Sequence, residues 1–276
     1  MLNSSVNYLN KNTSIIRSRQ ITLIKMKGSV QITSSAIIII LLLAVDRSEG
    51  DPRSQVLNLT CSQHCATSAN FIPNFVHVME EISTRIQTSH TATTVMGTGP
   101  DLIYALAECY GDLSPDDCMI CYVVARTAIP VCLPCVGSQV FLDGCFIRTQ
   151  NYNFFEENVG SNDIVICGNT TRYDVSLDST MQVISDAARD APKNRDYFAR
   201  KVALSGTTNE STYVLADCWG TLNESSCKEC LERASSSILQ CLPWSEGRAL
   251  HIGCFMRYFN TNFLNDDPTR GNNGGN

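Results

Sequence analysis

The chain lacks any concentrated run of basic residues. Its 276 residues include 21 Lys and Arg against 27 Asp and Glu, which gives a formal net charge of -6 and a pI near 5.2. Proteins that bind the phosphate backbone of DNA or RNA present a concentrated basic face. The composition therefore argues against a nucleic-acid partner.

Long apolar segments are also scarce. The run from Ser34 to Val45 contains about ten consecutive apolar residues, fewer than the ~20 that a membrane-spanning helix needs. It is preceded by the basic residues Arg17, Arg19, Lys25 and Lys27, which is the pattern of a secretory signal peptide. We expect residues 1–49 to be a leader, with Met26 as an alternative start, and we expect no membrane span in the mature chain. An uncleaved membrane anchor is the alternative.

Signatures of catalysis are few. The motifs Gly-x-Ser-x-Gly and His-Glu-x-x-His are both absent. Adjacent carboxylates such as Glu80-Glu81 and Asp116-Asp117 would point about 100° apart on a helix, so we expect them at the solvated surface. No two of the four histidines occupy equivalent positions of the tandem repeat that the cysteine spacing defines. They are His64, His77, His90 and His251. We therefore expect a non-enzymatic protein without catalytic residues or a cofactor.

Cysteine, by contrast, is abundant, with 14 residues. Ten of them form two sets with the same spacing, C-x8-C-x2-C-x10-C-x12-C. Identical spacing is expected when the sulfurs are fixed in space by bonds, and it indicates a tandem duplication. The two sets are Cys109, Cys118, Cys121, Cys132 and Cys145, and Cys218, Cys227, Cys230, Cys241 and Cys254.

The leader and the cysteine count together indicate disulfide bonds, because thiols oxidise in the secretory pathway. Each repeat has six equivalent cysteines if Cys61 and Cys167 begin the two sets, while Cys65 and Cys135 occur in the first repeat alone. An even count allows three bridges in each repeat and one extra bridge. The spacing does not choose among the fifteen connectivities of six cysteines.

A zinc site is the main alternative for these cysteines. Two C-x2-C pairs have a spacing close to that of four-thiolate zinc sites: Cys118 with Cys121, and Cys132 with Cys135. The second repeat has Trp244 at the position of Cys135, so the same fold has to form there without a fourth ligand. We therefore expect no metal. A redox-active C-x-x-C site is also disfavoured, because no thioredoxin-like βαβ pattern surrounds it.

Four Asn-x-Ser/Thr sequons agree with passage through the secretory pathway. They predict N-glycosylation in exposed loops or at the ends of secondary-structure elements. The acceptor residues are Asn58, Asn169, Asn209 and Asn223.

Apolar residues at steps of three and four predict a helix near the start of each repeat. Its inward face carries Phe71, Phe75, Val78, Ile82 and Ile86 in the first repeat, and Met181, Ile184 and Ala188 in the second. Cap-like residues before Cys118 and Cys227 predict a second helix in each repeat. The inward face of this helix carries Cys121, Val124, Ala125 and Ala128, and in the other repeat Cys230, Leu231, Ala234 and Ile238.

The end of each repeat is rich in β-branched and aromatic residues, which predicts a strand over 140–148 and another over 249–257. The polar stretch 151–163 predicts the domain boundary. We expect a first domain over 56–157 and a second over 163–264. The tail 265–276 has no apolar residue except Pro268, and we expect it to be disordered.

These motifs resemble the ginkbilobin-homologous, or stress-antifungal, domain of land plants. The resemblance covers about residues 56–264 and rests on the C-x8-C-x2-C core, the repeat endings 143–148 and 253–258, and the tandem arrangement. The segments 97–101, 109–114 and 241–250 are similar to the ectodomain of cysteine-rich receptor-like kinases. The resemblance implies an α+β fold in which each repeat packs two helices on a five-stranded antiparallel sheet.

The resemblance also implies the disulfide pairing. It joins the first cysteine to the fifth, the second to the third and the fourth to the sixth. In this sequence the pairs are Cys61 with Cys132, Cys109 with Cys118, Cys121 with Cys145, Cys167 with Cys241, Cys218 with Cys227, and Cys230 with Cys254. Cys65 and Cys135 remain, and we expect them to bond to each other.

The antifungal member of this family holds mannose with an Asn, an Arg and a Glu. The equivalent positions here are Ser62, Gln139 and Gln150 in the first repeat, and Gly168, Arg248 and Phe259 in the second. Only Arg248 keeps the family's residue, so it is the candidate ligand contact. Because the amide and the carboxylate for sugar hydroxyls are replaced, we expect mannose binding to be weak.

From this resemblance we expect a secreted binding module of plant stress or defence signalling in the apoplast, whose partners are related receptor ectodomains. The alternative is an antifungal lectin that binds mannose or another cell-wall carbohydrate. The chain ends at Asn276 without a membrane span, a Gly-rich phosphate loop or a His-Arg-Asp motif. It is therefore either a secreted protein or part of a longer receptor kinase.

Overall fold

The computed structural model describes residues 53–161, 163–171, 177–204 and 211–265. The predicted leader, the acceptor Asn209 and residues 266–276 of the tail lie outside these ranges. Among the residues that the structure describes, no helix has the length and apolar character needed to cross a membrane.

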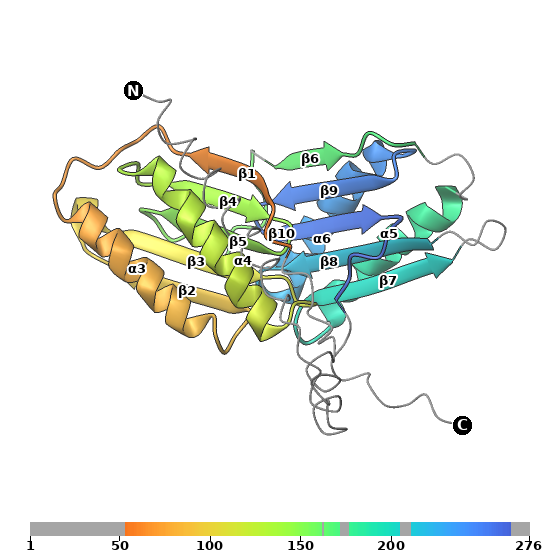
Figure 1. The fold of residues 1–276 in the computed structure, drawn as a ribbon, viewed down its shortest axis with the longest axis horizontal. Helices are drawn as coiled ribbons and strands as arrows, with labels where there is room; N and C mark the ends of the chain where they lie inside the picture. Colours follow the sequence, from red (N-terminus) through yellow and green to blue (C-terminus); the bar gives the residue numbers. More distant parts are fainter. Residues whose placement is uncertain (1–52, 162, 172–176, 205–210, 266–276) are drawn as a thin grey trace, which may run out of the picture. The chain divides into compact units, whose positions relative to one another are not determined.

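Each repeat folds into one five-stranded antiparallel sheet with two helices (Figure 1). The first repeat contains β1 (Val56–Cys61), α3 (Phe71–Arg85), β2 (Thr91–Met96), β3 (Ile103–Cys109), α4 (Pro115–Ala128), β4 (Ser138–Leu142) and β5 (Cys145–Gln150). The second contains β6 (Ile164–Cys167), α5 (Leu177–Asp190), β7 (Phe198–Leu204), β8 (Ser211–Cys218), α6 (Glu224–Ile238), β9 (Glu246–His251) and β10 (Cys254–Phe259). The strand orders β1-β4-β5-β3-β2 and β6-β9-β10-β8-β7 are equivalent, which confirms the predicted α+β fold and the duplication.

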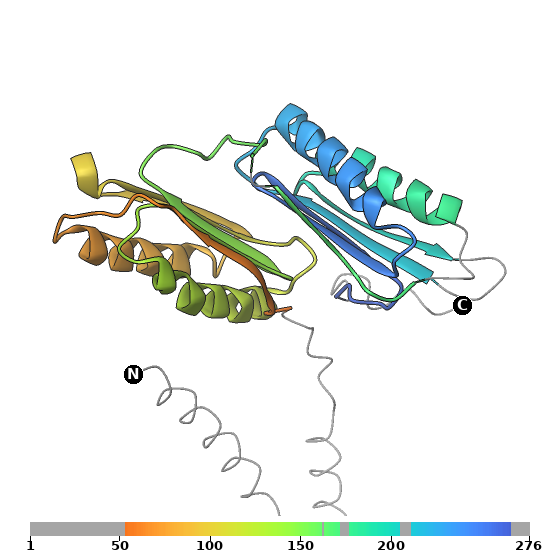
Figure 2. The ribbon, with the colours of Figure 1, turned by 90° about the horizontal axis from the view of Figure 1, so that it is seen from above.

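Both helices of a repeat lie along the same face of its sheet (Figure 2). On α3 the predicted inward face is buried, from Phe71 to Ile82. On α5 the prediction was wrong at Met181, which is 39% exposed. Thr180 points inward instead, and its hydroxyl hydrogen-bonds to that of Thr212 at 3.1 Å. Because the inward-facing Thr180 is polar, the apolar residues alone did not show which face of this helix is buried.

The second helix of each repeat begins at a capping residue. Ser114 Oγ accepts a hydrogen bond from the Asp117 amide at 3.1 Å, and Asn223 Oδ1 accepts one from the Ser226 amide at 2.9 Å. Such caps satisfy amides that have no partner inside the helix. The Asp117 side chain is buried and accepts a hydrogen bond from Ser114 Oγ, so the expectation of a solvated surface was wrong for this residue.

The predicted single strands at the repeat ends are hairpins. In the first repeat β4 and β5 pair Phe141 with Phe146, and in the second β9 and β10 pair Leu250 with Phe255. The chain reverses at Asp143–Gly144 in the first hairpin. Because apolar residues continue on both sides of this turn, the sequence pattern resembled one long strand.

Both faces of each sheet are buried. The helices cover one face, where the core of each repeat lies. A third apolar cluster contains side chains from both repeats, and it joins the opposite faces of the two sheets. Its buried members are Leu106, Tyr110, Phe141, Phe146, Phe154, Leu215, Trp219, Leu222, Leu250, Phe255 and Phe263. The two repeats therefore share one continuous apolar interface.

Seven disulfides close the structure. Six of them join the cysteines that the family resemblance implies, and the seventh joins the two cysteines that remained. The pairs are Cys61–Cys132, Cys65–Cys135, Cys109–Cys118, Cys121–Cys145, Cys167–Cys241, Cys218–Cys227 and Cys230–Cys254. The extra bridge links two residues that also form an isolated β-bridge, and Thr171 and Trp244 form the equivalent β-bridge in the second repeat. The backbone arrangement thus persists where the extra disulfide is absent.

The extra bridge should therefore contribute less stability than a core bridge. We expect Cys65→Ser with Cys135→Ser to lower the free energy of unfolding by about 1 to 2 kcal/mol, because the Cys61–Cys132 bridge already closes almost the same loop. We expect Cys121→Ser with Cys145→Ser to cost about 4 kcal/mol, since both sulfurs lie in the core. Urea unfolding of the two double variants measures this difference, and equal losses would contradict it.

Candidate functional site

The interface between the repeats is built from equivalent residues in reciprocal contact. Tyr110 stacks on Phe255 with ring centroids 4.2 Å apart and an interplanar angle of 14°. The equivalent pair, Trp219 and Phe146, stacks at 4.8 Å with the same angle. Trp219 also donates its indole N–H to the Ile252 carbonyl. Tyr110 donates its hydroxyl proton to the Leu142 carbonyl at 3.1 Å. These contacts give the interface an approximate twofold symmetry.

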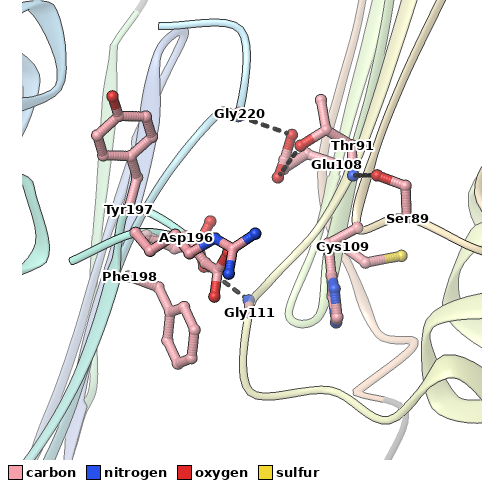
Figure 3. Close-up of a pocket in the computed structure, with 12 residues that line it drawn as sticks. Ser89, Thr91, Glu108, Cys109, Gly111, Asp196, Tyr197, Phe198 and Gly220 are labelled. Carbon is pink, nitrogen blue, oxygen red and sulfur yellow. Dashed lines mark hydrogen bonds between the residues drawn. The ribbon is translucent and has the colours of Figure 1, made fainter. Parts of the chain in front are cut away.

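Two buried carboxylates follow the same symmetry. Glu108 is the penultimate residue of β3, directly before Cys109, and Asp217 has the equivalent place in β8. Asp217 Oδ2 accepts a hydrogen bond from the Gly111 amide at 2.7 Å, and Glu108 Oε2 accepts one from the Gly220 amide at 3.2 Å (Figure 3). Each carboxylate is therefore held by a glycine amide of the other repeat.

Burial raises the pKa of both carboxyl groups. For Glu108, loss of hydration is the main cause, and the nearby charge of Asp217 raises its pKa further. Hydrogen bonds from Thr91 and Gly220 oppose this shift without cancelling it. For Asp217, burial again dominates, opposed by the hydrogen bond from Gly111. A buried carboxyl group with a raised pKa takes up a proton at a higher pH than an exposed one does.

A cavity of about 340 Å³ lies between the repeats beside these two groups. Thr91 and Glu108 line it from the first repeat, and Asp217, Phe198 and the exposed Asp196 line it from the second (Figure 3). The site was missed in the sequence, although an acidic residue one position before equivalent cysteines and a glycine two positions after them were visible in both repeats.

A cluster of ion pairs lies elsewhere in the interface. Arg248 donates to the two carboxylate oxygens of Asp143, from Nε at 2.6 Å and from Nη2 at 2.9 Å. Arg257 Nη1 lies 3.5 Å from Asp143, and Glu246 Oε1 lies 2.8 Å from an Nη2 atom of each arginine. The candidate ligand contact Arg248 is 8% exposed, and its Nε and Nη2 donors are engaged by carboxylates. A sugar that bound to Nε or Nη2 would have to displace these partners.

The equivalent positions in the first repeat surround an open pocket of about 510 Å³. Ser62, Gln139 and Gln150 line it together with Arg148 and Glu157. Arg148 Nη2 donates to Glu157 Oε2 at 2.8 Å, and its guanidinium lies over the Phe154 ring. We call this the polar pocket. The sequence located three of its residues through the family resemblance but did not indicate Arg148 or Glu157.

In the second repeat a larger residue stands at the position of a glycine that lines this pocket. Glu246 is the residue equivalent to Gly137, and its backbone and Cβ lie close to the backbone of Gly168. The Glu246 carboxylate then bonds to Arg248 and Arg257 as described above. The same position is thus an open polar pocket in one repeat and an ion-pair cluster in the other.

Three of the four predicted glycosylation sites can be placed. Asn169 is exposed in a bend after β6, and Asn223 is exposed at the cap of α6. Asn58 is half-buried in the edge strand β1, where Thr60 Oγ1 donates to its side chain at 2.9 Å. Attachment at Asn58 stays a prediction, as it does at the other three residues.

The four cysteines with zinc-like spacing bond to four different cysteines in the structure, so their sulfurs are held as disulfides. Another group of potential metal ligands, Cys230, His251 and Cys254, contains a disulfide as well.

Asn265, which the sequence placed in the tail, is held at the interface between the repeats. Its backbone amide donates to Asp112 at 3.4 Å, and its carbonyl accepts from Arg200 at 2.9 Å.

Comparison with known proteins agrees with this architecture. The family model described as salt stress response/antifungal matches residues 60–152 and 162–261, one match for each repeat. The chain belongs to the salt stress response/antifungal family. It carries two of the family's domains in tandem, and the predicted relationship to ginkbilobin-homologous proteins is confirmed.

Relatives of the chain include a receptor-like kinase and an antimicrobial protein. The chain is 45% identical over 244 residues to cysteine-rich receptor-like protein kinase 2 of Arabidopsis thaliana, covering 87% of this chain and 37% of that protein. It is 26% identical over 192 residues to an antimicrobial ginkbilobin-2-like protein of Castanea crenata, covering 67% of this chain and 78% of that one. The chain thus spans well under half the length of the receptor kinase.

A solved structure shows the same fold. The tandem DUF26 ectodomain of the Arabidopsis thaliana cysteine-rich receptor-like protein PDLP8 superposes with a TM-score of 0.61 at 21% identity, covering 76% of this chain and all of that one. Together with the relatives, this likeness is consistent with an extracellular signalling module.

The ion-pair cluster generates a prediction about stability. We expect Asp143→Asn to lower the free energy of unfolding by about 3 kcal/mol, because it leaves two buried guanidinium groups with Glu246 as their remaining carboxylate. The control Glu232→Gln removes a carboxylate that is 64% exposed and pairs with the equally exposed Lys228, so it should cost less than about 1 kcal/mol. Chemical denaturation measures both, and an Asp143→Asn loss as small as the control's would contradict the structural role of the cluster.

The two carboxylates with raised pKa generate a pH dependence. Between the ordinary pKa near 4 and the raised value, the folded protein binds more protons than the unfolded chain, so their contribution to stability grows as the pH falls and is lost as the pH rises. The quantity to measure is the Tm of the wild type minus the Tm of the double variant Glu108→Gln with Asp217→Asn. We expect this difference to be about 3 °C larger at pH 5 than at pH 7.

The control for this series is Glu80→Gln, which removes an exposed carboxylate of α3. Its Tm should follow the wild-type pH dependence. If the double variant also follows the wild type at every pH, the two carboxyl groups do not carry the effect.

Proposed function

We propose that the protein is a secreted, non-enzymatic binding module of plant stress or defence signalling that acts in the apoplast by associating with related receptor ectodomains. Its similarity to a cysteine-rich receptor-like kinase, to an antimicrobial ginkbilobin-2-like protein and to a cysteine-rich repeat secretory protein supports this function. The seven disulfides suit an extracellular compartment.

One difference between the repeats carries the proposal. On the outer face of α4, Ile120 and Val123 are 50% and 48% exposed. The equivalent residues of α6 are Glu229 and Glu232, which are exposed and charged. Exposed apolar side chains on one copy of a duplicated surface are typical of a protein contact, because solubility alone would favour the charged version on both copies.

Exchange of these residues tests the proposal. We expect the wild-type protein to bind at least one tandem ectodomain of the same family, and Ile120→Glu with Val123→Glu to weaken this binding at least tenfold. The variant gives the first repeat the residues of the second, so the fold should tolerate it. Glu229→Ala with Glu232→Ala is the matched control and should bind normally. Surface plasmon resonance against a panel of ectodomains measures these affinities, and a panel without any binder would contradict the proposal.

Carbohydrate binding is the second candidate function, and the polar pocket favours it. Arg148 and Glu157 supply a guanidinium and a carboxylate beside Gln139 and Gln150, and such groups hydrogen-bond sugar hydroxyls. The residues that hold mannose in the antifungal relative are nevertheless replaced.

We therefore expect mannose to bind more weakly than about 1 mM, the weak end of measurable affinity. Isothermal titration calorimetry checks this expectation. Micromolar binding that is lost in Gln139→Ala would replace the protein-binding function with the lectin function. Retention of that binding in Arg248→Ala would place it in the polar pocket of the first repeat.

A further inference from the structure

The cavity between the repeats is lined by two buried carboxylates for which no ion pair is found in the described part of the chain. Glu108 is 4% exposed and Asp217 is 2% exposed, and both line the cavity. Among the residues that the structure describes, neither carboxylate forms an ion pair within 4.0 Å. Uncompensated charges at such depth are costly, and proteins usually pair them with an opposite charge.

The hydrogen bonds leave one oxygen open. Glu108 accepts from Thr91 and from Gly220, one bond to each oxygen. Asp217 accepts from Gly111 through Oδ2, while no hydrogen bond to Oδ1 is found within the described part of the chain. This side chain is nine-tenths buried and lines the cavity, so its remaining acceptor lies in the wall of the cavity.

The charged groups around the cavity are few. Arg53 acts electrostatically on Asp217, but its guanidinium pairs with Asp112 at 2.5 Å. His90 hydrogen-bonds through Nε2 to the Leu113 carbonyl. The remaining charged residues are Arg195 and Asp196, which are exposed and of opposite sign. The lining of the cavity is therefore acidic overall.

We propose that this cavity is a binding site for a cationic group, a guanidinium or ammonium, that takes its place between Glu108 and Asp217. Five donors in a planar fork allow a guanidinium to serve several acceptors at once, which suits a site with carboxylates on two walls. The Phe198 ring lines the same wall as Asp217, and aromatic rings also attract cations. The ligand is the basic side chain of an extracellular peptide or protein, and a free polyamine is the other source of the same chemistry.

The site is separate from the polar pocket and from the outer face of α4, so its existence does not depend on either proposed function. Binding is linked to protons. Burial and mutual repulsion raise the pKa of Glu108, and burial raises that of Asp217, so a bound cation replaces protons that the two groups hold at acidic pH. Affinity for a cation should therefore increase with pH.

Nuclear magnetic resonance gives a direct test, because the Gly111 and Gly220 amides donate to the two carboxylates. The probes are acetyl-Gly-Arg-Gly-amide, spermidine, and acetyl-Gly-citrulline-Gly-amide as the neutral control. At pH 7 we expect the arginine peptide to shift both amide signals in a saturable manner, with a Kd of roughly 1 mM or tighter. The citrulline peptide should leave them unchanged. Saturable shifts with spermidine as well would identify a general ammonium site, while shifts with the arginine peptide alone would identify a basic side chain as the ligand.

Variants and pH complete the test. Asp217→Asn keeps an oxygen for the Gly111 amide, so the fold should persist, and we expect it to weaken binding about tenfold or more. Glu80→Gln should bind as the wild type does. Wild-type affinity should fall about tenfold between pH 7 and pH 5. Equal shifts by the citrulline peptide, binding that is independent of pH, or no saturable shift with either cation at 20 mM (roughly twentyfold above that Kd) would overturn the proposal.

Discussion

Burial of the second face of each sheet against the other repeat is the constraint on which the rest of the structure depends. A sheet with helices on one face commonly leaves its other face to water. Here β3, β5, β8 and β10 carry large apolar side chains on both faces, and one of these faces needs a cover. The reciprocal stacks of Tyr110 on Phe255 and of Trp219 on Phe146 supply it. Neither repeat provides this cover alone.

The same constraint explains why the duplicated residues have different roles. Near the symmetry axis, equivalent residues meet reciprocally, so Glu108 and Asp217 are both kept as acids and Gly111 and Gly220 as glycines. A side-chain carbon at Gly111 would collide with the Phe198 ring. Away from the axis the repeats diverge. Glu246 completes an ion-pair cluster in the second repeat, while Gly137 leaves the polar pocket open in the first.

Much of the fold could be predicted from the sequence because the cysteine spacing shows both the duplication and the family. The helix of the first repeat was equally plain, since its inward positions are large and apolar. Predictions failed where a polar residue faces inward, as Thr180 does, and where apolar residues continue through a turn, as around Asp143. Arg248 was predicted as a ligand contact from its place in one repeat. Its engagement by Asp143 comes from the other repeat, and contacts across an interface leave no periodic pattern in the sequence.

The claim that the two repeats form one cooperative unit can be tested by differential scanning calorimetry of the mature protein with its disulfides intact. If the shared apolar interface couples the repeats, a single transition is expected, with calorimetric and van't Hoff enthalpies that agree. Trp219→Ala, which removes the largest side chain of the interface, should then split or broaden this transition. Two resolved transitions in the wild-type protein would contradict the account, because they would show that each repeat is stable without the other.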